Sequence, residues 1–122
     1  MAQILIIEDD VEYRNILKQM LERQNYEVAI ASDGEEGIKI FRENPVPLVI
    51  TDILMPNKEG IETIFEFERE FPETKIIAIS GGGTGPANDY LKAAGSIDNV
   101  KRTFEKPFAM DELMTAVKEL IG

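Results

Sequence analysis

The amino-acid sequence predicts an α/β fold in which helices cover both faces of a five-stranded, doubly wound parallel sheet. The first observation is that five short strand-like runs alternate with five segments in which apolar residues recur at helical spacing. The second is that only short turn-forming stretches separate these segments, which is typical of strand–helix–strand units. A length of 122 residues with 43% hydrophobic residues fits one domain of ordinary size. We therefore predict a single domain over residues 1–122.

The first half of the chain is expected to contain two strands, each followed by a helix. Ile4–Ile7 is an apolar run, and helical spacing begins at Val11 and stops near Asn25, which tolerates the left-handed backbone of a helix end. Glu27–Ala31 is expected to form a short second strand. Asp33, with a glutamate three positions later, makes a capping box that opens the second helix.

The second half begins with the run Leu48–Thr51, which lacks any alternation and is typical of a strand covered on both faces. This strand leads directly into Asp52. The remaining elements are expected to be a helix over Gly60–Phe71, a strand over Lys75–Ser80, a helix over Pro86–Ala94, a strand over Val100–Glu105 and a final helix over Met110–Ile121. The strand over residues 100–105 is the least apolar of the five, so we expect it at an edge of the sheet.

Composition excludes several classes of function. The chain has no cysteine and no histidine, which rules out disulfides, thiolate metal sites and histidine-based acid–base catalysis by its own residues. Its formal net charge of -10 disfavours nucleic acid or an anionic membrane as a direct partner. With no apolar run long enough to span a bilayer and no signal peptide, we expect a soluble, cytoplasmic protein whose output domain is a separate protein.

Polar side chains follow four of the predicted strands, and parallel strands bring their carboxyl ends to one edge of the sheet. These residues are Glu8 and Asp9, then Asp52, Ser80 and Lys106. Two carboxylates about 5 Å apart repel by about 3 kcal/mol at an effective dielectric constant near 20, so three of them need a cation or a raised pKa. Mg²⁺, which prefers oxygen ligands, would satisfy this need and leave Asp52 as a nucleophile towards phosphoryl groups.

Four segments together resemble the receiver domain of two-component response regulators. They are ILIIEDDVEYR at the start, LVITDILMP in the centre, IIAIS, and FEKPF near the end. Each follows or contains a predicted strand, and the resemblance spans essentially the whole chain. It implies a flavodoxin-like fold with strand order 2-1-3-4-5.

The resemblance also implies roles for the acidic residues. Asp52 would accept a phosphoryl group from a phosphohistidine of a histidine kinase or a histidine phosphotransfer protein. Asp9 and Asp52 would bind Mg²⁺, with Mn²⁺ as an alternative ion. Glu8 would contribute mainly through water, and the backbone carbonyl of Leu54 would be the remaining protein ligand.

By the same resemblance, Ser80 would be the switch hydroxyl and Lys106 the partner of the phosphate. The Lys106–Pro107 bond would be cis, which only an X–Pro bond allows at small cost. Two positions depart from the family pattern: Glu8 replaces the commoner Asp, and Thr103 stands where the family usually has the Tyr or Phe of its switch.

We therefore predict a phospho-acceptor switch that catalyses its own phosphorylation and dephosphorylation and is not a conventional enzyme. Its output is expected to be binding of a downstream protein at the face formed by the fourth helix, fifth strand and fifth helix, or onward phosphotransfer. We expect a monomer or a weak, phosphorylation-dependent dimer.

Several alternatives stay open from the sequence. A haloacid-dehalogenase-type phosphatase also uses an Asp nucleophile and Mg²⁺, but it needs a second Asp where this chain has Leu54. A pseudo-receiver would signal without phosphate, and a flavodoxin relative would use the GGGTG stretch for a nucleotide, although that stretch lacks the spacing of known nucleotide loops. Asp10 has two equally weighted interpretations, as the cap of the first helix or as a supporting residue of the site.

Overall fold

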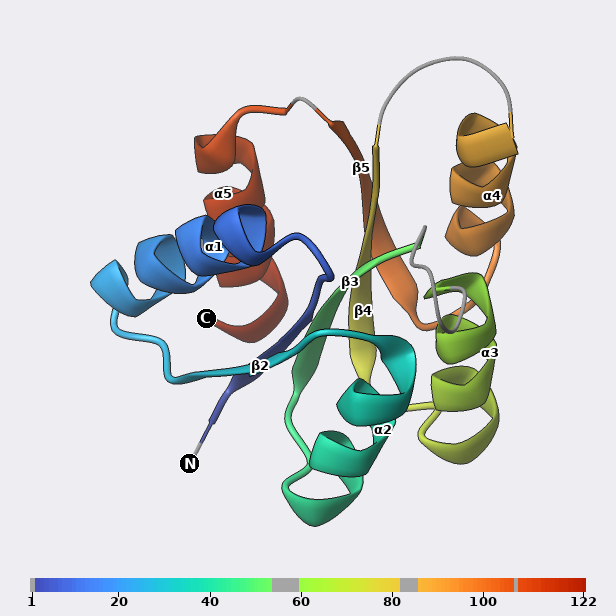
Figure 1. Cartoon of the computed structure of the whole chain (residues 1–122), viewed down its shortest axis with the longest axis horizontal. Coiled ribbons are helices and arrows are strands. Elements are labelled where there is room, and N and C mark those ends of the chain that lie inside the picture. Colours follow the sequence, from blue (N-terminus) through green and yellow to red (C-terminus); the bar gives the residue numbers. More distant parts are fainter. Residues whose placement is uncertain (1, 54–59, 82–85, 107) are drawn as a thin grey trace.

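The computed structural model describes residues 2–53, 60–81, 86–106 and 108–122 of the chain. Within these ranges it contains five strands and five helices in strict alternation (Figure 1). The elements are β1 (Ile4–Ile7), α1 (Val11–Arg23), β2 (Val28–Ala31), α2 (Gly34–Glu43), β3 (Leu48–Asp52), α3 (Gly60–Glu70), β4 (Lys75–Gly81), α4 (Pro86–Gly95), β5 (Val100–Lys106) and α5 (Met110–Ile121).

All five strands are parallel and lie in the order β2-β1-β3-β4-β5, which confirms the predicted fold class and topology. β5 forms one edge of the sheet, as its weaker hydrophobicity indicated. The boundaries differ from the prediction by about one residue: β2 begins at Val28, β4 extends to Gly81 and β5 extends to Lys106.

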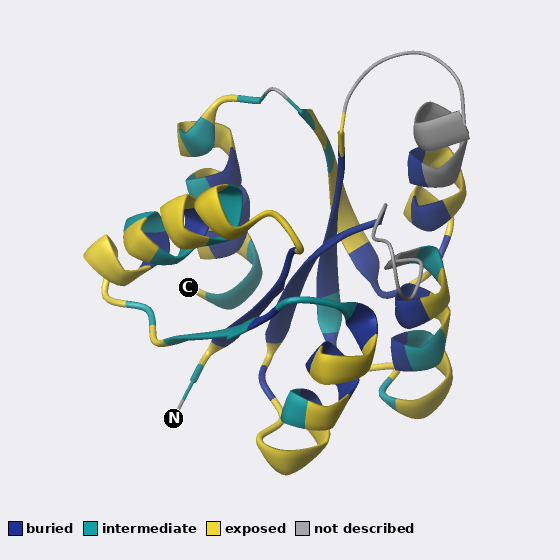
Figure 2. Cartoon of the chain, viewed as in Figure 1, coloured by how far each residue is buried: buried dark blue, intermediate teal, exposed yellow. Residues whose placement is uncertain are grey.

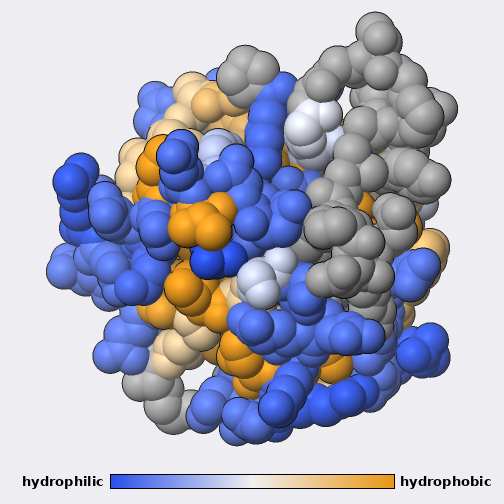
Figure 3. Space-filling view, in the orientation of Figure 1, coloured by the Kyte–Doolittle hydropathy of each residue, from blue (hydrophilic) through white to orange (hydrophobic). Residues whose placement is uncertain are grey.

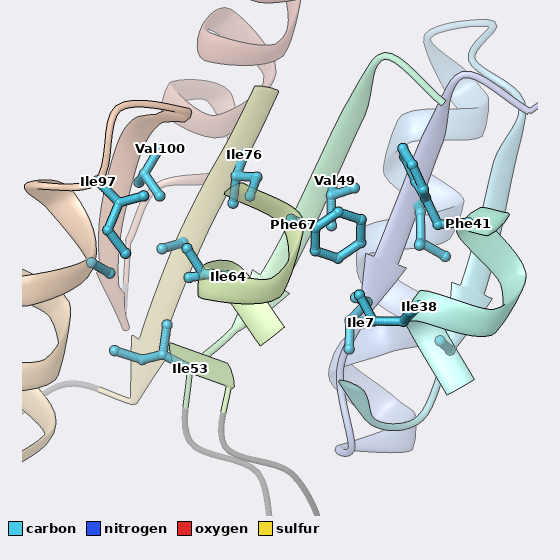
Figure 4. Packing of buried hydrophobic residues seen from close by; sticks show 14 of the residues in the cluster. Ile7, Ile38, Phe41, Val49, Ile53, Ile64, Phe67, Ile76, Ile97 and Val100 are labelled. Carbon is cyan, nitrogen blue, oxygen red and sulfur yellow. The ribbon is translucent and has the colours of Figure 1, made fainter. Parts of the chain in front are cut away.

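The helices form two layers around the sheet, with α1 and α5 on one face and α2, α3 and α4 on the other (Figure 1). A hydrophobic cluster fills each interface. On the α2–α4 side, Ile38 and Phe41 of α2 and Ile64 and Phe67 of α3 belong to one buried cluster, in which Phe67 lies next to Val49 of β3 and Ile38 next to Ile7 of β1 (Figure 4). The strands β1 and β3 therefore have both faces covered and are buried along their whole length (Figure 2).

Local sequence signals account for the helix ends. Asp33 accepts a hydrogen bond from the backbone N–H of Glu36 at 2.9 Å, as expected for an N-cap. Glu36 in turn accepts one from the backbone N–H of Ser32 at 3.2 Å. Asn25 follows the end of α1 with a positive φ of 70°, which confirms the predicted left-handed residue.

Gly37 lets α2 approach β1 closely. A Cβ atom at this position would collide with the side chain of Ile7, the last residue of β1. Since Glu8 follows Ile7 directly, this packing helps to hold the end of β1 in place.

Hydrophilic residues cover most of the described part of the face seen in Figure 3, with smaller hydrophobic areas between them. Among the helices in the described part of the chain, none combines the length and the apolar character needed to cross a membrane.

Candidate functional site

Strand register brings the predicted polar residues together at the carboxyl edge of the sheet, toward the top of Figure 1. Ile7 pairs with Thr51, so the next residues, Glu8 and Asp52, leave neighbouring strands at the same level. Across the adjoining ladders, Asp52 pairs with Ile79, and Gly81 pairs with Lys106. The four strand ends thus converge as the sequence predicted.

Lys106 connects two of the acidic residues directly. Its ammonium nitrogen lies 2.8 Å from Glu8 Oε1 and 3.0 Å from Asp52 Oδ2, and it donates a hydrogen bond to each. The side chains of Glu8 and Asp52 are 3% and 7% exposed, whereas that of Lys106 is 21% exposed. The three charges form a largely buried ion-pair network in which charge-assisted hydrogen bonds hold the ammonium against both carboxylates.

Burial dominates the electrostatics of this network. The pKa of Glu8 is raised from its usual 4.5 to about 7: burial is the largest cause, the hydrogen bond from Lys106 opposes the shift, and the nearby charge of Asp52 adds to it. Burial alone would lower the pKa of Lys106, but the hydrogen bonds and negative charges of Glu8 and Asp52 outweigh it, so this pKa is raised. Glu8 and Asp52 therefore share one cation, the ammonium of Lys106, and Glu8 still binds a proton near neutral pH.

Carboxylate oxygens of Glu8, Asp9 and Asp52 all lie within 4.8 Å of one another. Asp9 is exposed, so the cluster opens to solvent on its side, while the other two acids are buried. A set of clustered carboxylate oxygens with an open side fits Mg²⁺, which takes one or two carboxylates and keeps several waters. The residues present thus fit the metal that the sequence predicted.

Backbone hydrogen bonds hold the acids in position. The N–H of Glu8 donates to Ala31 at 3.0 Å, which extends the β1–β2 ladder past the end of the strand. The carbonyl of Glu8 accepts from Arg14 Nη1 at 3.0 Å, and the carbonyl of Asp52 accepts from Thr51 Oγ1 at 3.0 Å. Both carboxylates therefore project from anchored backbone.

The structure places the other predicted residues as follows. Ser80 is buried, 1% exposed, at the end of β4, and its hydroxyl makes a long contact of 3.5 Å with the carbonyl of Gly81. Thr103 is exposed on β5, paired with Ala78 rather than with the strand end. Leu54 and Pro107, and with them the predicted carbonyl ligand and cis bond, lie outside the described residues.

Asp10 caps α1: its side chain accepts from the N–H of Tyr13 at 3.2 Å. Its own backbone N–H points to Glu8 Oε2 at 3.3 Å. The capping interpretation is therefore seen directly, and Asp10 also touches the site through its backbone.

Sequence reasoning missed Tyr13 as a member of the site. An aromatic residue at helical spacing is ordinarily core-facing, but the Tyr13 ring lies under the ammonium of Lys106, with 4.0 Å between the nitrogen and the ring centroid. The available signal was its place in the first turn of the helix that follows the acids.

Comparisons with known proteins agree on one family. The family model for the response regulator receiver domain matches residues 4–118. The response regulator ArlR of Staphylococcus saprophyticus is 31% identical over 121 residues, covering 99% of this chain and 53% of the relative. The transcriptional regulatory protein CpxR of Klebsiella pneumoniae is 29% identical, covering 99% and 50%. The chain thus spans about half the length of the curated relatives it matches.

Two solved structures show the same architecture. A response regulator receiver domain protein from Clostridium thermocellum has a TM-score of 0.88 at 30% identity, covering 99% of this chain and 94% of the other. The response regulator TrrA of Thermotoga maritima, solved in complex with Mg²⁺ and BeF, has a TM-score of 0.85 at 30% identity, covering 99% and 100%. Both are similar to this chain over its whole length.

Proposed function

Because this chain belongs to the response regulator receiver domain family of two-component systems, we propose that it is a phospho-acceptor switch with Asp52 as the phosphorylated residue. Asp52 accepts a phosphoryl group from a phosphohistidine of a histidine kinase or histidine phosphotransfer protein. It later loses the group to water, so the chain catalyses its own modification and is not a conventional enzyme.

One observation carries this proposal: the Asp52 carboxylate is buried at a sheet edge, bonded to Lys106 and clustered with two further acids. A carboxylate whose only role was to interact with solvent would not be expected to share a buried site with two other acids and an ammonium. The cost of burying these charges is understandable if the site handles a substrate that is itself highly charged.

The chemistry is a phosphoryl transfer between two proteins. A carboxylate oxygen of Asp52 forms a bond to phosphorus, the phosphorus–nitrogen bond to the partner's imidazole breaks, and the imidazole nitrogen keeps the electron pair and takes up a proton. Hydrolysis by water then releases inorganic phosphate and restores Asp52. Asp9 and Asp52 would hold Mg²⁺ directly and Glu8 would hold it through water, and the ion would neutralise negative charge on the phosphoryl oxygens.

Lys106 and Ser80 respond to the new group. The aspartyl phosphate carries about two negative charges, so the ammonium of Lys106 moves from Glu8 towards the phosphate oxygens. Ser80 supplies a hydroxyl from the end of β4, the neighbouring strand. These shifts bias the face of α4, β5 and α5 towards a conformation that binds a downstream protein, or expose the phosphate for onward transfer.

The partners follow from the same reasoning. The phosphohistidine must come from outside these 122 residues, because they contain no histidine. Its net charge of -10 favours a basic protein surface over nucleic acid or a membrane. We place the reaction in the cytoplasm, with the chain as a monomer or a weak, phosphorylation-dependent dimer, and the Mg²⁺–BeF complex of TrrA supports Mg²⁺ as the metal.

Intact mass spectrometry tests the proposal. The protein is incubated with acetyl phosphate and Mg²⁺, and the expected result is a gain of one phosphate that EDTA prevents. Asp52→Ala should abolish the gain, whereas Asp98→Ala, which removes an exposed acid away from the site, should leave it unchanged. Absence of the gain in the unaltered chain, together with no binding of Mg²⁺, would instead support a pseudo-receiver.

A further inference from the structure

The ammonium of Lys106 has a third contact that carries no charge. Besides Glu8 and Asp52, it lies over the face of the Tyr13 ring, 4.0 Å from the centroid. A cation over an aromatic face at this distance is attracted by the negative face of the ring, and the attraction grows when water is excluded. Tyr13 is itself partly buried, and burial raises the pKa of its hydroxyl.

The Tyr13 ring is also the first of three aromatic rings in contact. It meets the ring of Phe108 edge to face, with centroids 6.3 Å apart and planes at 80°. Phe108 then packs on Phe104 of β5, with centroids 5.1 Å apart. All three join the hydrophobic cluster between the sheet and the α1 and α5 layer.

This chain of rings lies on the opposite side of β5 from Thr103. Side chains alternate along a strand, and Phe104 packs into the α1–α5 cluster, while the methyl group of Thr103 lies next to Gly95 of α4. The family's usual aromatic at position 103 is absent, but the following residue supplies an aromatic on the other face of the sheet.

We infer that Tyr13 is a positioning residue for Lys106. The face of the Tyr13 ring holds the Lys106 ammonium at the acid cluster, and movement of the ammonium is transmitted through Phe108 to Phe104. The inference rests on the proposed function of Asp52 for its signalling half, but the positioning half concerns the unphosphorylated chain. A lysine side chain has four rotatable bonds, so a ring that restricts its ammonium lowers the entropy lost when it binds a phosphoryl group.

Movement of Lys106 changes the surroundings of the Tyr13 ring. When the ammonium leaves Glu8 for a phosphate oxygen, its position over the ring changes, and the edge-to-face contact with Phe108 must adjust because the cluster is closely packed. The displacement then reaches β5 without any aromatic residue at position 103. The surface that responds is therefore the side of β5 that faces α5.

Three variants separate positioning from simple packing. Tyr13→Phe keeps the ring face and loses only the hydroxyl, whereas Tyr13→Leu keeps apolar volume without a ring. Tyr26→Leu is the matched control, since Tyr26 packs against the same hydrophobic cluster, while the only cation–ring contact in the described part of the chain is that of Lys106 with Tyr13.

The positioning half is tested by NMR of the metal-free protein, with the Lys106 side-chain signals assigned by their loss in Lys106→Gln. A ring beneath the ammonium shifts the nearby protons upfield. We expect this shift in the unaltered chain, in Tyr13→Phe and in Tyr26→Leu, and its loss in Tyr13→Leu. Lys106 signals that are the same in Tyr13→Leu and the unaltered chain would overturn the inference, whatever the phosphorylation experiments show.

The signalling half of the inference is tested in two ways. Acetyl phosphate with Mg²⁺ gives the rate of phosphorylation, and beryllofluoride with Mg²⁺ gives a mimic of the phosphorylated state. Tyr13→Leu should slow phosphorylation by about three- to tenfold, with Tyr13→Phe and Tyr26→Leu within about twofold of the unaltered chain. The NMR signals of the Phe104 and Phe108 rings should shift on addition of beryllofluoride in the unaltered chain, in Tyr13→Phe and in Tyr26→Leu, but not in Tyr13→Leu.

The results distinguish this inference from the proposed function. If the unaltered chain takes no phosphate, the proposed function fails, while the Lys106 signals still decide whether Tyr13 positions the ammonium. If the chain is phosphorylated and Tyr13→Leu matches it in rate and in the Phe104 response, the proposed function stands and the role of Tyr13 is disproved.

Discussion

Lys106 and Glu8 are 98 positions apart in the sequence, yet Lys106 Nζ lies 2.8 Å from Glu8 Oε1 at the edge of the sheet. Glu8 directly follows the first strand and Lys106 ends the last one, and the sheet order places β3 and β4 between those two strands. In this arrangement the protein supplies its own cation to a pair of buried acids. A metal ion that binds to Glu8 and Asp52 therefore has to compete with the ammonium of Lys106.

The first prediction concerns this competition. Lys106→Ala leaves Glu8 and Asp52 buried without their cation, and we expect a loss of about 1–3 kcal/mol in unfolding free energy without metal. The loss is below that of a fully buried pair because the Lys106 side chain is 21% exposed and Glu8 can take up a proton. Mg²⁺ should then stabilise the variant more than the unaltered chain.

Thermal unfolding with and without Mg²⁺ measures both effects. Lys101→Ala is the matched control, because Lys101 is an exposed lysine of the same strand whose ammonium donates a hydrogen bond to the backbone carbonyl of Asp98. An equal Mg²⁺ stabilisation of Lys106→Ala and the unaltered chain would show that Lys106 does not compete with the metal.

The second prediction concerns pH. The pKa of Glu8 is raised from 4.5 to about 7 on folding, so the folded state binds the proton more tightly than the unfolded chain does. The resulting stability is fully present below pH 4.5 and is lost as the pH rises to about 7, by up to about 3 kcal/mol. In Glu8→Gln this part of the pH dependence should disappear.

Urea unfolding of the metal-free protein between pH 4.5 and 7.5 checks this. Glu12→Gln is a suitable control, since it makes the same change at an exposed position a few residues away. If Glu8→Gln keeps the slope of the unaltered chain over this range, the burial of Glu8 does not perturb its ionisation as described.

The third prediction concerns Asp10, for which the sequence left two interpretations. Its side chain caps α1, so Asp10→Ala should cost about 1 kcal/mol, while Asp10→Asn should cost little because Asn also caps well. If capping is its whole role, Mg²⁺ affinity should be nearly the same in the unaltered chain and in Asp10→Asn. A tenfold weaker Mg²⁺ affinity in Asp10→Asn, measured by calorimetry, would show a direct role of the Asp10 carboxylate in the site.

The sequence was sufficient to predict the fold class because its patterns were local, while the strand order was predicted from the resemblance to receiver domains. Uninterrupted apolar runs such as Leu48–Thr51 indicate buried parallel strands, and the helical spacing between them sets the alternation. The convergence of Glu8, Asp52, Ser80 and Lys106 followed from one physical rule, that parallel strands end at a common edge. Register, burial and the ion pairs then came from the structure.

The role of Tyr13 was not predictable in the same way. An aromatic residue at helical spacing next to a strand is ordinarily part of the core, and Tyr13 does pack against the α1–α5 cluster. Its contact with Lys106 depends on how α1 lies relative to the end of β5, which is a three-dimensional relationship between segments more than 90 positions apart. Spacing within one helix contains no information about that distance.

The position of Phe104 illustrates the same limit. The sequence showed that Thr103 replaces an expected aromatic, but it did not show that the next residue projects to the other face and meets Phe108. Consecutive side chains of a strand point to opposite faces of the sheet. The effect of having the aromatic one position later therefore depends on which residues the helix layer on that face places against it.

The most direct test of the central claim is chemical mapping of the phosphorylated carboxylate. After incubation with acetyl phosphate and Mg²⁺, borohydride reduction converts an aspartyl phosphate to homoserine, and trypsin separates residues 1–14, which contain Glu8 and Asp9, from residues 43–58, which contain Asp52. We predict that homoserine appears at position 52 alone. Reduction within residues 1–14, or an unmodified Asp52 in a protein that carries phosphate, would contradict the account.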